Sequence, residues 1–242
     1  LLWASLFAGV AFLLAHASYM VLSAHRKRHA AETDALEAAR ADLPPKIVRH
    51  SGAARLFHWV MAASMLTLLL TAFLPIAGVQ FAWVTWHWIA GLVLTAVVLF
   101  HIVRALFWQR LKCMWIRAKD FRELADPSVK AGKYTIAQKG MHAAVTVLTL
   151  LVIGSGLVMF AMIDTPWWDR TNSISEAALG WVFLIHGLST LALIVLISLH
   201  IYFGLRPEKL FYTRSMISGW ISKDELEANH NPAAPWASGK SG

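Results

Sequence analysis

Five long apolar stretches dominate this chain and restrict the folds it can adopt. They cover residues 1–23, 57–78, 83–106, 141–163 and 181–204. A helix of about twenty apolar residues crosses a bilayer, whereas membrane-spanning strands are shorter and alternate between apolar and polar positions. The whole chain is 57% hydrophobic and only 15% charged, which is unlike a soluble domain. The sequence therefore predicts an all-α integral membrane protein, in which the last four stretches form a four-helix transmembrane bundle and the first adds an N-terminal transmembrane helix.

The basic residues lie almost entirely on one side of this predicted arrangement. Of the 22 Lys and Arg residues, 21 fall in segments 24–56, 104–140 and 205–242, and none falls in the short loop at 79–82. Loops rich in Lys and Arg stay on the cytoplasmic side of a membrane. We therefore expect a multi-pass protein of the bacterial inner membrane with a cytoplasmic C-terminus. We interpret the net charge of +8 as a topology signal, since no soluble module remains that could bind nucleic acid.

This topology divides the chain into four predicted parts. They are an N-terminal transmembrane helix at 1–23, a cytoplasmic linker at 24–49, a four-helix membrane domain at 50–204 and a cytoplasmic tail at 205–242. The Ala/Glu-rich residues 30–42 are predicted to form a surface helix that ends before Pro44. Pro232 and the Ser/Gly-rich end predict little fixed structure in the tail. His50 and His230 lie in polar segments and are expected to be solvated.

Two histidines, His186 and His200, lie fourteen residues apart within the last apolar stretch. Fourteen residues are close to four helical turns, so both rings leave the same face of the helix, about 21 Å apart along its axis. One ring then lies near each membrane surface. Ionisable side chains inside a membrane are costly and indicate function by default, and histidine is a common axial ligand of haem. The spacing therefore predicts two stacked cofactors, and haem is the cofactor that fits best.

Six histidines in all lie in or at the ends of the bundle helices. In the outer leaflet the bundle has His87 and His186, so an outer haem with two histidine ligands would have to use both. The inner ends carry four: His58, His101, His142 and His200. Spacing favours His200 as one inner ligand. For its partner, His58 and His101 are equally good and His142 ranks third. The competing interpretation is that single histidines anchor helix ends at the interface or bond a backbone carbonyl.

Four segments, taken together, resemble a known family. They are RLFHW at 55–59, AGKYTIAQK at 131–139, IHGLSTLALIVLISLHIYFG at 185–204 and SGWISKDELEANHNPAAPW at 218–236, with His87 opening the second bundle helix. In order and spacing they are similar to the cytochrome b (gamma) subunit of membrane-bound formate dehydrogenases and to its cytochrome b561-like relatives. The resemblance runs from about Arg49 to Trp236, roughly three quarters of the chain.

The resemblance implies that residues 50–204 form a di-haem cytochrome b domain. Its two haem b groups would be bound through their iron by His87 with His186 on the outer side, and by His58 with His200 on the inner side. The resemblance thus selects His58 as the partner of His200, where spacing alone left the choice open.

The resemblance also implies a quinone site, for menaquinone or ubiquinone, beside the inner haem. Thr135 and Gln138 are the candidate quinone contacts, although the family carries Asn where this chain has Thr135. His101 is a candidate alternative haem ligand, or a contact of quinone or of a haem propionate. Arg104 lies one turn further along and could pair with a propionate.

The family further implies catalytic partners. A molybdenum or tungsten catalytic subunit and an iron–sulfur subunit would lie in the periplasm and deliver electrons to the outer haem, and the membrane quinone pool would receive them near the cytoplasmic surface. Cys113 is the only cysteine, so this chain cannot itself hold an iron–sulfur cluster. We therefore expect an electron-transfer subunit of a respiratory formate dehydrogenase-type complex, with no primary substrate site of its own.

Three alternatives remain open at this point. The catalytic partner could be a hydrogenase or a sulfur-compound reductase. The chain could act alone as a b561-type quinol oxidoreductase, although the long basic loop at 104–140 favours a subunit of a complex. The histidines could instead line a metal or proton transporter, but such proteins usually have broken helices or internal repeats, and this sequence shows neither.

Overall fold

The computed structural model describes residues 2–23, 43–108, 114–126, 129–232, 234, 236 and 237. The surface helix predicted at 30–42 and the residues His25, His29 and Cys113 lie outside this part of the chain. The described residues are mostly helical, which confirms the predicted all-α class. Four helices are long and apolar enough to cross a membrane: α3 (Gly52–Phe73), α4 (Trp83–Trp108), α6 (Ile136–Phe160) and α7 (Glu176–Leu205).

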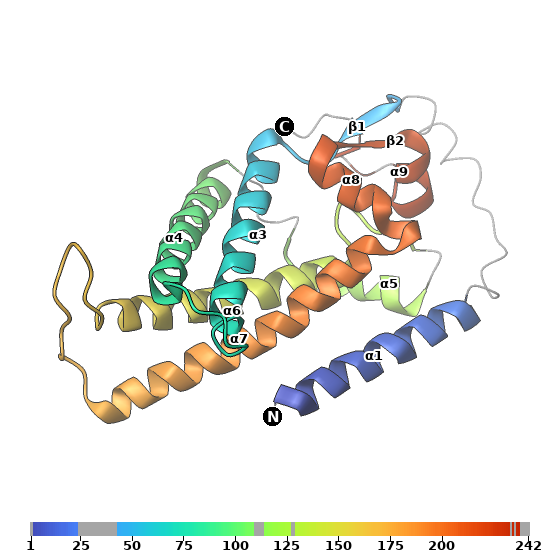
Figure 1. The fold of residues 1–242 in the computed structure, drawn as a ribbon. Coiled ribbons are helices and arrows are strands. Elements are labelled where there is room, and N and C mark those ends of the chain that lie inside the picture. Colours follow the sequence, from blue (N-terminus) through green and yellow to red (C-terminus); the bar gives the residue numbers. More distant parts are fainter. Residues whose placement is uncertain are drawn as a thin grey trace.

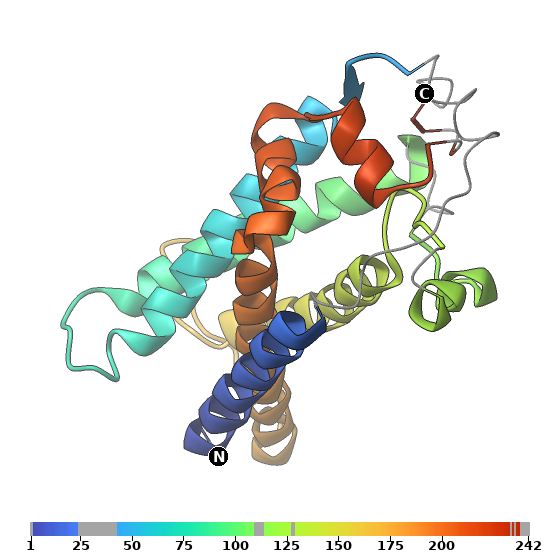
Figure 2. The ribbon, with the colours of Figure 1, turned by 90° about the vertical axis from the view of Figure 1, so that its right-hand side faces the viewer.

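The N-terminal helix α1 (Leu2–Ser23) lies beside α7, as Figures 1 and 2 both show. The ring of His16 packs against two aromatic rings of α7, with centroid distances of 4.9 Å to Phe203 and 6.1 Å to Tyr202. The side chains described in α1 form a shorter apolar stretch, Ala8–Tyr19. That α1 crosses the membrane therefore stays a prediction.

The four long helices form two antiparallel pairs, α3 with α4 and α6 with α7, and the two pairs cross each other (Figures 1 and 2). Their shared core is built around Met65, Leu94 and Leu193. Only 11–17% of the most apolar stretch of each helix is buried. The remaining apolar side chains face outward, which suits a lipid environment and would be unusual on a soluble protein.

Three of these helices begin five residues before the start that hydropathy predicts, at 52, 136 and 176 instead of 57, 141 and 181. Each starts at a hydroxyl N-cap. The side chains of Ser51, Thr135 and Ser175 accept hydrogen bonds from the backbone N–H three residues on, at 3.2–3.3 Å. Such caps satisfy otherwise unpaired N–H groups at a helix start. Hydropathy predicts where the apolar part of each helix begins, whereas the polar N-cap residues mark where the helix itself begins.

A small folded unit, here called the cap, covers one end of the bundle and consists of residues 43–50, 129–135 and 207–232, together with 234, 236 and 237. In it, β1 (Lys46–Val48) pairs antiparallel with β2 (Trp220–Ser222), so that Ile47 lies opposite Ile221. The helices α8 (Leu210–Ser218) and α9 (Lys223–Asn229) and a 3-10 turn (Pro207–Lys209) complete it, and Figure 1 shows these elements gathered beside the start of α3. Its core includes Ile47, Phe211, Ile221 and Leu226. We call this end of the bundle the cap end and the opposite end, with residues 74–82 and 161–175, the loop end.

The cap corrects two expectations from the sequence. The tail has fixed structure through His230, because the strand at 46–48 supplies a pairing partner that tail composition alone cannot reveal. His230 is not solvated but completely buried. Its Nδ1–H donates to the carbonyl of Gly132 at 2.7 Å, and its Nε2 accepts from Nη1 of Arg49 at 2.9 Å. Burial, reinforced by the charge of Arg49, lowers the pKa of His230 to about 4.

Near the cap, two further short elements precede α6. A 3-10 turn (Ala118–Phe121) leads into α5 (Arg122–Ala125). Asp120 of this segment forms a buried ion pair with Lys139 in the first turn of α6, at 2.7 Å. Both charges are nearly inaccessible, so each depends on the other for compensation. The pair fixes the long connection to the start of α6.

Candidate functional site

At the loop end, the rings of His87 on α4 and His186 on α7 face each other across a gap. Their centroids are 6.4 Å apart and the ring planes lie at 61°. Two metal–imidazole bonds of about 2 Å each, added to the size of the two rings, give a centroid separation of about 6 Å. No hydrogen bond joins the two rings in the described structure. The gap therefore has the size of one metal centre with two axial histidines.

Each of these rings is held by a hydroxyl group from a different helix. Thr71 Oγ1 lies 2.8 Å from Nδ1 of His87, and Ser155 Oγ lies 3.0 Å from Nδ1 of His186. Both hydroxyls also donate to backbone carbonyls of their own helices, at 2.8 and 2.6 Å, so toward the rings they act as acceptors. This network assigns the ring proton to Nδ1 and leaves Nε2 with a free lone pair. Such anchoring is typical of histidines that bind metal.

Neither these two hydroxyl residues nor Gly156 was predicted from the sequence. A Cβ at Gly156 would lie 3.4 Å from Cε1 of His186, so glycine makes room for the ring. Thr71 and Ser155 are both buried within apolar helices. A lone hydroxyl in an apolar helix is a weak signal, because Ser and Thr in such helices often bond only their own backbone. Thr71 and Ser155 differ from such residues because each also contacts a histidine on a neighbouring helix.

At the cap end, His58 on α3 faces His200 on α7, with ring centroids 6.1 Å apart and planes at 53°. Helix α7 thus contributes one ring to each level, as the fourteen-residue spacing of His186 and His200 predicts. Nδ1 of His58 is buried and has no hydrogen-bond partner in the described protein. An unsatisfied buried nitrogen indicates a missing partner.

The other two inner histidines form a pair of their own. His101 on α4 faces His142 on α6, with centroids 6.4 Å apart and planes at 62°. The ring of Phe57 stacks on His101 at 4.1 Å. Where spacing left three candidates for the partner of His200, the structure places His58 there and sets His101 against His142.

The remaining predicted site residues lie at the cap end. Arg104 donates from Nη2 to Ser51 Oγ at 3.0 Å, while its Nη1 is buried without a partner. Thr135 and Gln138 form a reciprocal capping box at the start of α6. The box uses the Thr135 oxygen and the Gln138 amide oxygen as acceptors, so the hydroxyl proton and the amide N–H₂ remain as donors.

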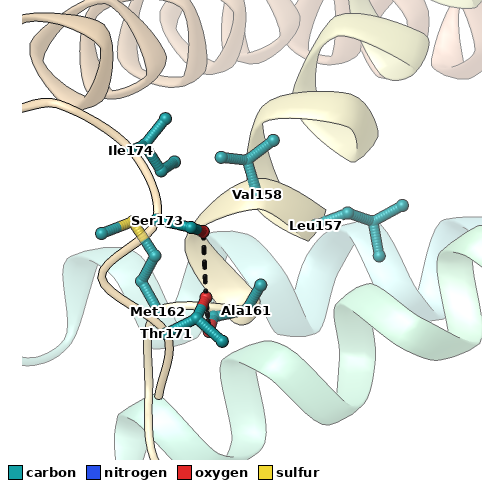
Figure 3. A pocket seen from close by; sticks show the side chains of 7 residues that line it. All are labelled: Leu157, Val158, Ala161, Met162, Thr171, Ser173 and Ile174. Carbon is teal, nitrogen blue, oxygen red and sulfur yellow. Dashed lines mark hydrogen bonds between the residues drawn. The ribbon is translucent and has the colours of Figure 1, made fainter.

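A cavity of about 480 Å³ lies at the loop end, between the end of α6 and the following loop. Figure 3 shows Leu157, Met162 and Ile174 among its lining residues, and a hydrogen bond from Ser173 to Thr171. None of its lining side chains is ionisable. The paired histidines do not line this cavity.

Comparison with known proteins agrees with this geometry. The family model of prokaryotic cytochrome b561 matches residues 49–219, a range that includes all six paired histidines. The formate dehydrogenase cytochrome b556(fdo) subunit of Escherichia coli (strain K12) is 22% identical over 203 residues, covering 76% of this chain and 90% of that protein. The "Probable Ni/Fe-hydrogenase B-type cytochrome subunit" of Bradyrhizobium diazoefficiens is 26% identical over 222 residues, covering 74% of this chain and 85% of that protein. Residues 49–219 are more than half of this chain, so the chain belongs to the prokaryotic cytochrome b561 family.

Proposed function

We propose that this chain is the cytochrome b subunit of a respiratory complex of the formate dehydrogenase type. In this proposal, electrons come from a periplasmic iron–sulfur subunit, which receives them from a molybdenum or tungsten catalytic subunit. They cross the inner membrane through two haem b groups, bound by His87 with His186 and by His58 with His200, and reduce quinone on the cytoplasmic side. The observation that carries the proposal is the loop-end pair, whose two rings are both oriented with Nε2 free.

The residues present fit haem b, the cofactor implied by the cytochrome b561 family. Each pair would provide two imidazole nitrogens to the iron, and the buried Nη1 of Arg104, which has no partner among the described residues, would suit a propionate. When bound, haem b supplies a one-electron carrier whose potential is set by its ligands and surroundings. The protein holds the ligand rings and fixes the protonation of the loop-end pair.

The apolar core separates the two levels of histidines. Leu94 lies seven residues from His87 and seven from His101, and Leu193 lies midway between His186 and His200 in the same way. Seven residues are about two turns, so each core residue shares a helix face with the histidines above and below it. Leu94 and Leu193 are only 1% and 3% exposed. Packed side chains thus keep the region between the two levels dry.

The proposed orientation places the cap in the cytoplasm. Segments 24–56, 104–140 and 205–242 carry 21 of the 22 basic residues, and where the structure describes these segments they join the bundle helices at the cap end. At the loop end, Trp88 contacts Trp167 at a centroid distance of 5.4 Å, and Trp167 is exposed. Exposed tryptophans are typical of the interface between membrane and water. Quinone would then bind near His200 and the donors of Thr135 and Gln138.

A hydrogenase is the second candidate for the catalytic partner, favoured by the 26% identity to the B-type cytochrome subunit. The two candidates differ in the electron donor and not in the role of this chain. Native purification of the complex in mild detergent, followed by mass spectrometry, identifies the partner subunits. In membranes, reduction of the b-type absorbance by formate and not by hydrogen supports the first candidate, and the reverse supports the second.

The haem assignment is tested by spectroscopy on single variants. His87→Ala should lose one haem per chain relative to the wild type, and His200→Ala should lose another. His16→Ala is a matched control, because His16 also lies in an apolar helix and contacts aromatic rings, yet it is not part of a pair; it should lose none. Wild-type protein without b-type absorbance, or His87→Ala with unchanged haem content, would contradict the proposal.

A further inference from the structure

The two proposed haem sites differ in the hydrogen bonds of their histidine rings. At the loop end, the Nδ1–H of His87 donates to Oγ1 of Thr71 at 2.8 Å. On the facing helix, the Nδ1–H of His186 donates to Oγ of Ser155 at 3.0 Å. At the cap end, Nδ1 of His58 is buried, and the described residues provide no acceptor for it. The two sites therefore offer the same type of ligand in different hydrogen-bonding states.

This difference acts on the reduction potential of a bound haem. A histidine that donates its Nδ1–H to an acceptor becomes a more basic ligand through Nε2. A more basic axial ligand stabilises the oxidised iron, which carries the greater positive charge, and so lowers the reduction potential. Both rings at the loop end donate in this way, so their two effects have the same sign. Hydrogen bonding thus makes the loop-end site the one of lower potential.

Positive charge near the cap-end site acts in the same sense. Arg55 lies one turn before His58 on α3, and its guanidinium donates to the carbonyl of Ile217 in α8. Just before this helix, burial and the positive charges around it, including that of Arg49, lower the pKa of His50 to about 3. Positive charge beside a haem opposes the further positive charge of the oxidised iron. The surroundings of His58 therefore raise the potential of a haem bound there.

The loop end has the opposite balance of charge. Its described loops contain Asp164 and Asp169, and Glu176 begins α7, against a single basic residue, Arg170. All four side chains are exposed, so solvent and salt screen them and their effect is small. Charge thus agrees with hydrogen bonding in sign, while the bonds at Nδ1 carry the larger part of the difference.

We propose that Thr71 and Ser155 hold the reduction potential of the loop-end haem below that of the cap-end haem. The proposal rests on the proposed function for the presence of both haems. An electron then resides preferentially at the cap end, near the proposed quinone contacts Thr135 and Gln138. The chain therefore favours electron flow from the loop end to the cap end, which is the direction of quinone reduction. Thr71 and Ser155 are positioning residues, because they act through the ligand rings.

A redox titration of the intact chain in mild detergent, followed by the b-type absorbance, tests the order of the two potentials. The wild type should titrate as two components. His87→Ala should remove the component of lower potential, and His200→Ala should remove the higher one. Loss of the higher component in His87→Ala overturns this proposal alone, as do two components of equal potential in the wild type. A chain without b-type absorbance overturns the proposed function as well, so the two failures are distinguishable.

Ser155→Ala tests the hydroxyl itself. This variant removes the acceptor of His186, so with both haems retained the lower component should shift to a higher potential and the other should stay in place. Thr71→Val should shift the same component in the same direction, whereas Ser155→Thr keeps a hydroxyl and should keep the wild-type potential. Ser64→Ala is the matched control, because Ser64 is also buried in an apolar helix but bonds only the carbonyl of Val60, at 2.9 Å.

The outcomes of these variants separate potential setting from packing. An unchanged lower component in both Ser155→Ala and Thr71→Val overturns the proposal, and so does a shift to lower potential. An equal shift in Ser64→Ala would assign the effect to helix packing and would also overturn it. A purely structural role of the hydroxyls changes haem retention or protein yield but leaves the potential of the retained haem in place.

Discussion

At the scale of single residues, Thr71 and Ser155 decide which nitrogen of each loop-end histidine can bind a metal. Each hydroxyl donates to its own helix backbone and accepts from a ring Nδ1 on a neighbouring helix. The orientation of both rings is therefore set before any cofactor binds. This arrangement reduces the reorganisation that binding requires, because the ligand lone pairs already point into the gap.

Thr71→Val tests this role of the hydroxyl. Valine has nearly the same shape but cannot accept the Nδ1–H of His87, so the loop-end site should lose about ten- to hundredfold in haem affinity. Haem transfer to apomyoglobin measures the affinity, and a redox titration should show one shifted component. Thr95→Val is the matched control, since Thr95 bonds only the carbonyl of Gly91 and should leave haem binding unchanged. Equal effects in both variants would assign Thr71 a packing role only.

At the scale of elements, polar residues at helix ends determine where the helices start and how the cap joins them. Thr135 and Gln138, the candidate quinone contacts implied by the family resemblance, form the capping box of α6. Gly219 ends α8 with a φ of +91°. Its carbonyl accepts from the N–H groups of Arg49 and His50 at 2.8 and 3.0 Å. At Gly219, local backbone geometry thus controls a contact between segments far apart in the chain.

Substitutions of Thr135 should separate its capping role from quinone binding. Thr135→Ala should destabilise the first turn of α6 by about 1 kcal/mol, whereas Thr135→Asn should keep the N-cap hydrogen bond of the helix. Hydrogen exchange of residues 136–139 reads out the helix start, and the KM for a soluble quinone analogue reads out the proposed site. If Thr135→Asn changes the hydrogen exchange of residues 136–139 as much as Thr135→Ala does, the N-cap hydrogen bond is not what stabilises this turn.

Gly219→Ala should weaken the attachment of the cap. The left-handed conformation costs a residue with a Cβ about 1–2 kcal/mol, and a Cβ at this position would lie 3.0 Å from the carbonyl oxygen of His50. Hydrogen exchange in α8 and β2 should accelerate, with the centre of α7 unaffected. Gly132→Ala is a suitable control, because nothing lies within 4 Å of its added Cβ. Unchanged exchange in α8 would show that the turn tolerates alanine.

At the scale of the whole molecule, the protein has two cores, one within the bundle and one within the cap. Arg49 connects three segments of the cap. It bonds Nε2 of His230 and the carbonyl of Lys133, at 2.9 and 3.0 Å, and lies over the ring of Tyr212 at 4.6 Å. The predicted quinone-site loop at 131–139 is therefore fixed partly by the tail. Cap folding and the geometry of the cap-end site are physically linked.

The stability of the cap should depend on pH through His230. Its pKa is lowered from 6.5 to about 4 in the folded protein, so between these values the unfolded cap binds a proton that the folded cap does not. The free energy of cap opening should be constant above pH 6.5 and fall as the pH drops toward 4, with at most about 3 kcal/mol of this loss due to His230. Protection factors of β1 and α8, corrected for intrinsic exchange, measure it.

The matched variant for this effect is His230→Gln, which cannot titrate. It should lose the part of the pH dependence due to His230, about half of it, and keep the part due to His50, whose pKa burial and the charge of Arg49 lower to about 3. A wild-type cap with the same protection factors at pH 5 and pH 7 would contradict the assignment. So would a His230→Gln protein with an undiminished slope.

The sequence by itself determined the helical membrane class, the family resemblance and the levels of the histidines along their helices. These follow from local rules, because hydropathy requires a helix of a given length and a constant rise per residue places His186 and His200 at two levels. Only the tertiary structure decided that His101 faces His142, that Thr71 and Ser155 bind ring nitrogens, and that His230 is buried beside Arg49. Each of these depends on segments far apart in the chain meeting at one place. Spacing within a single helix cannot specify such contacts, since they are set by how helices pack against one another.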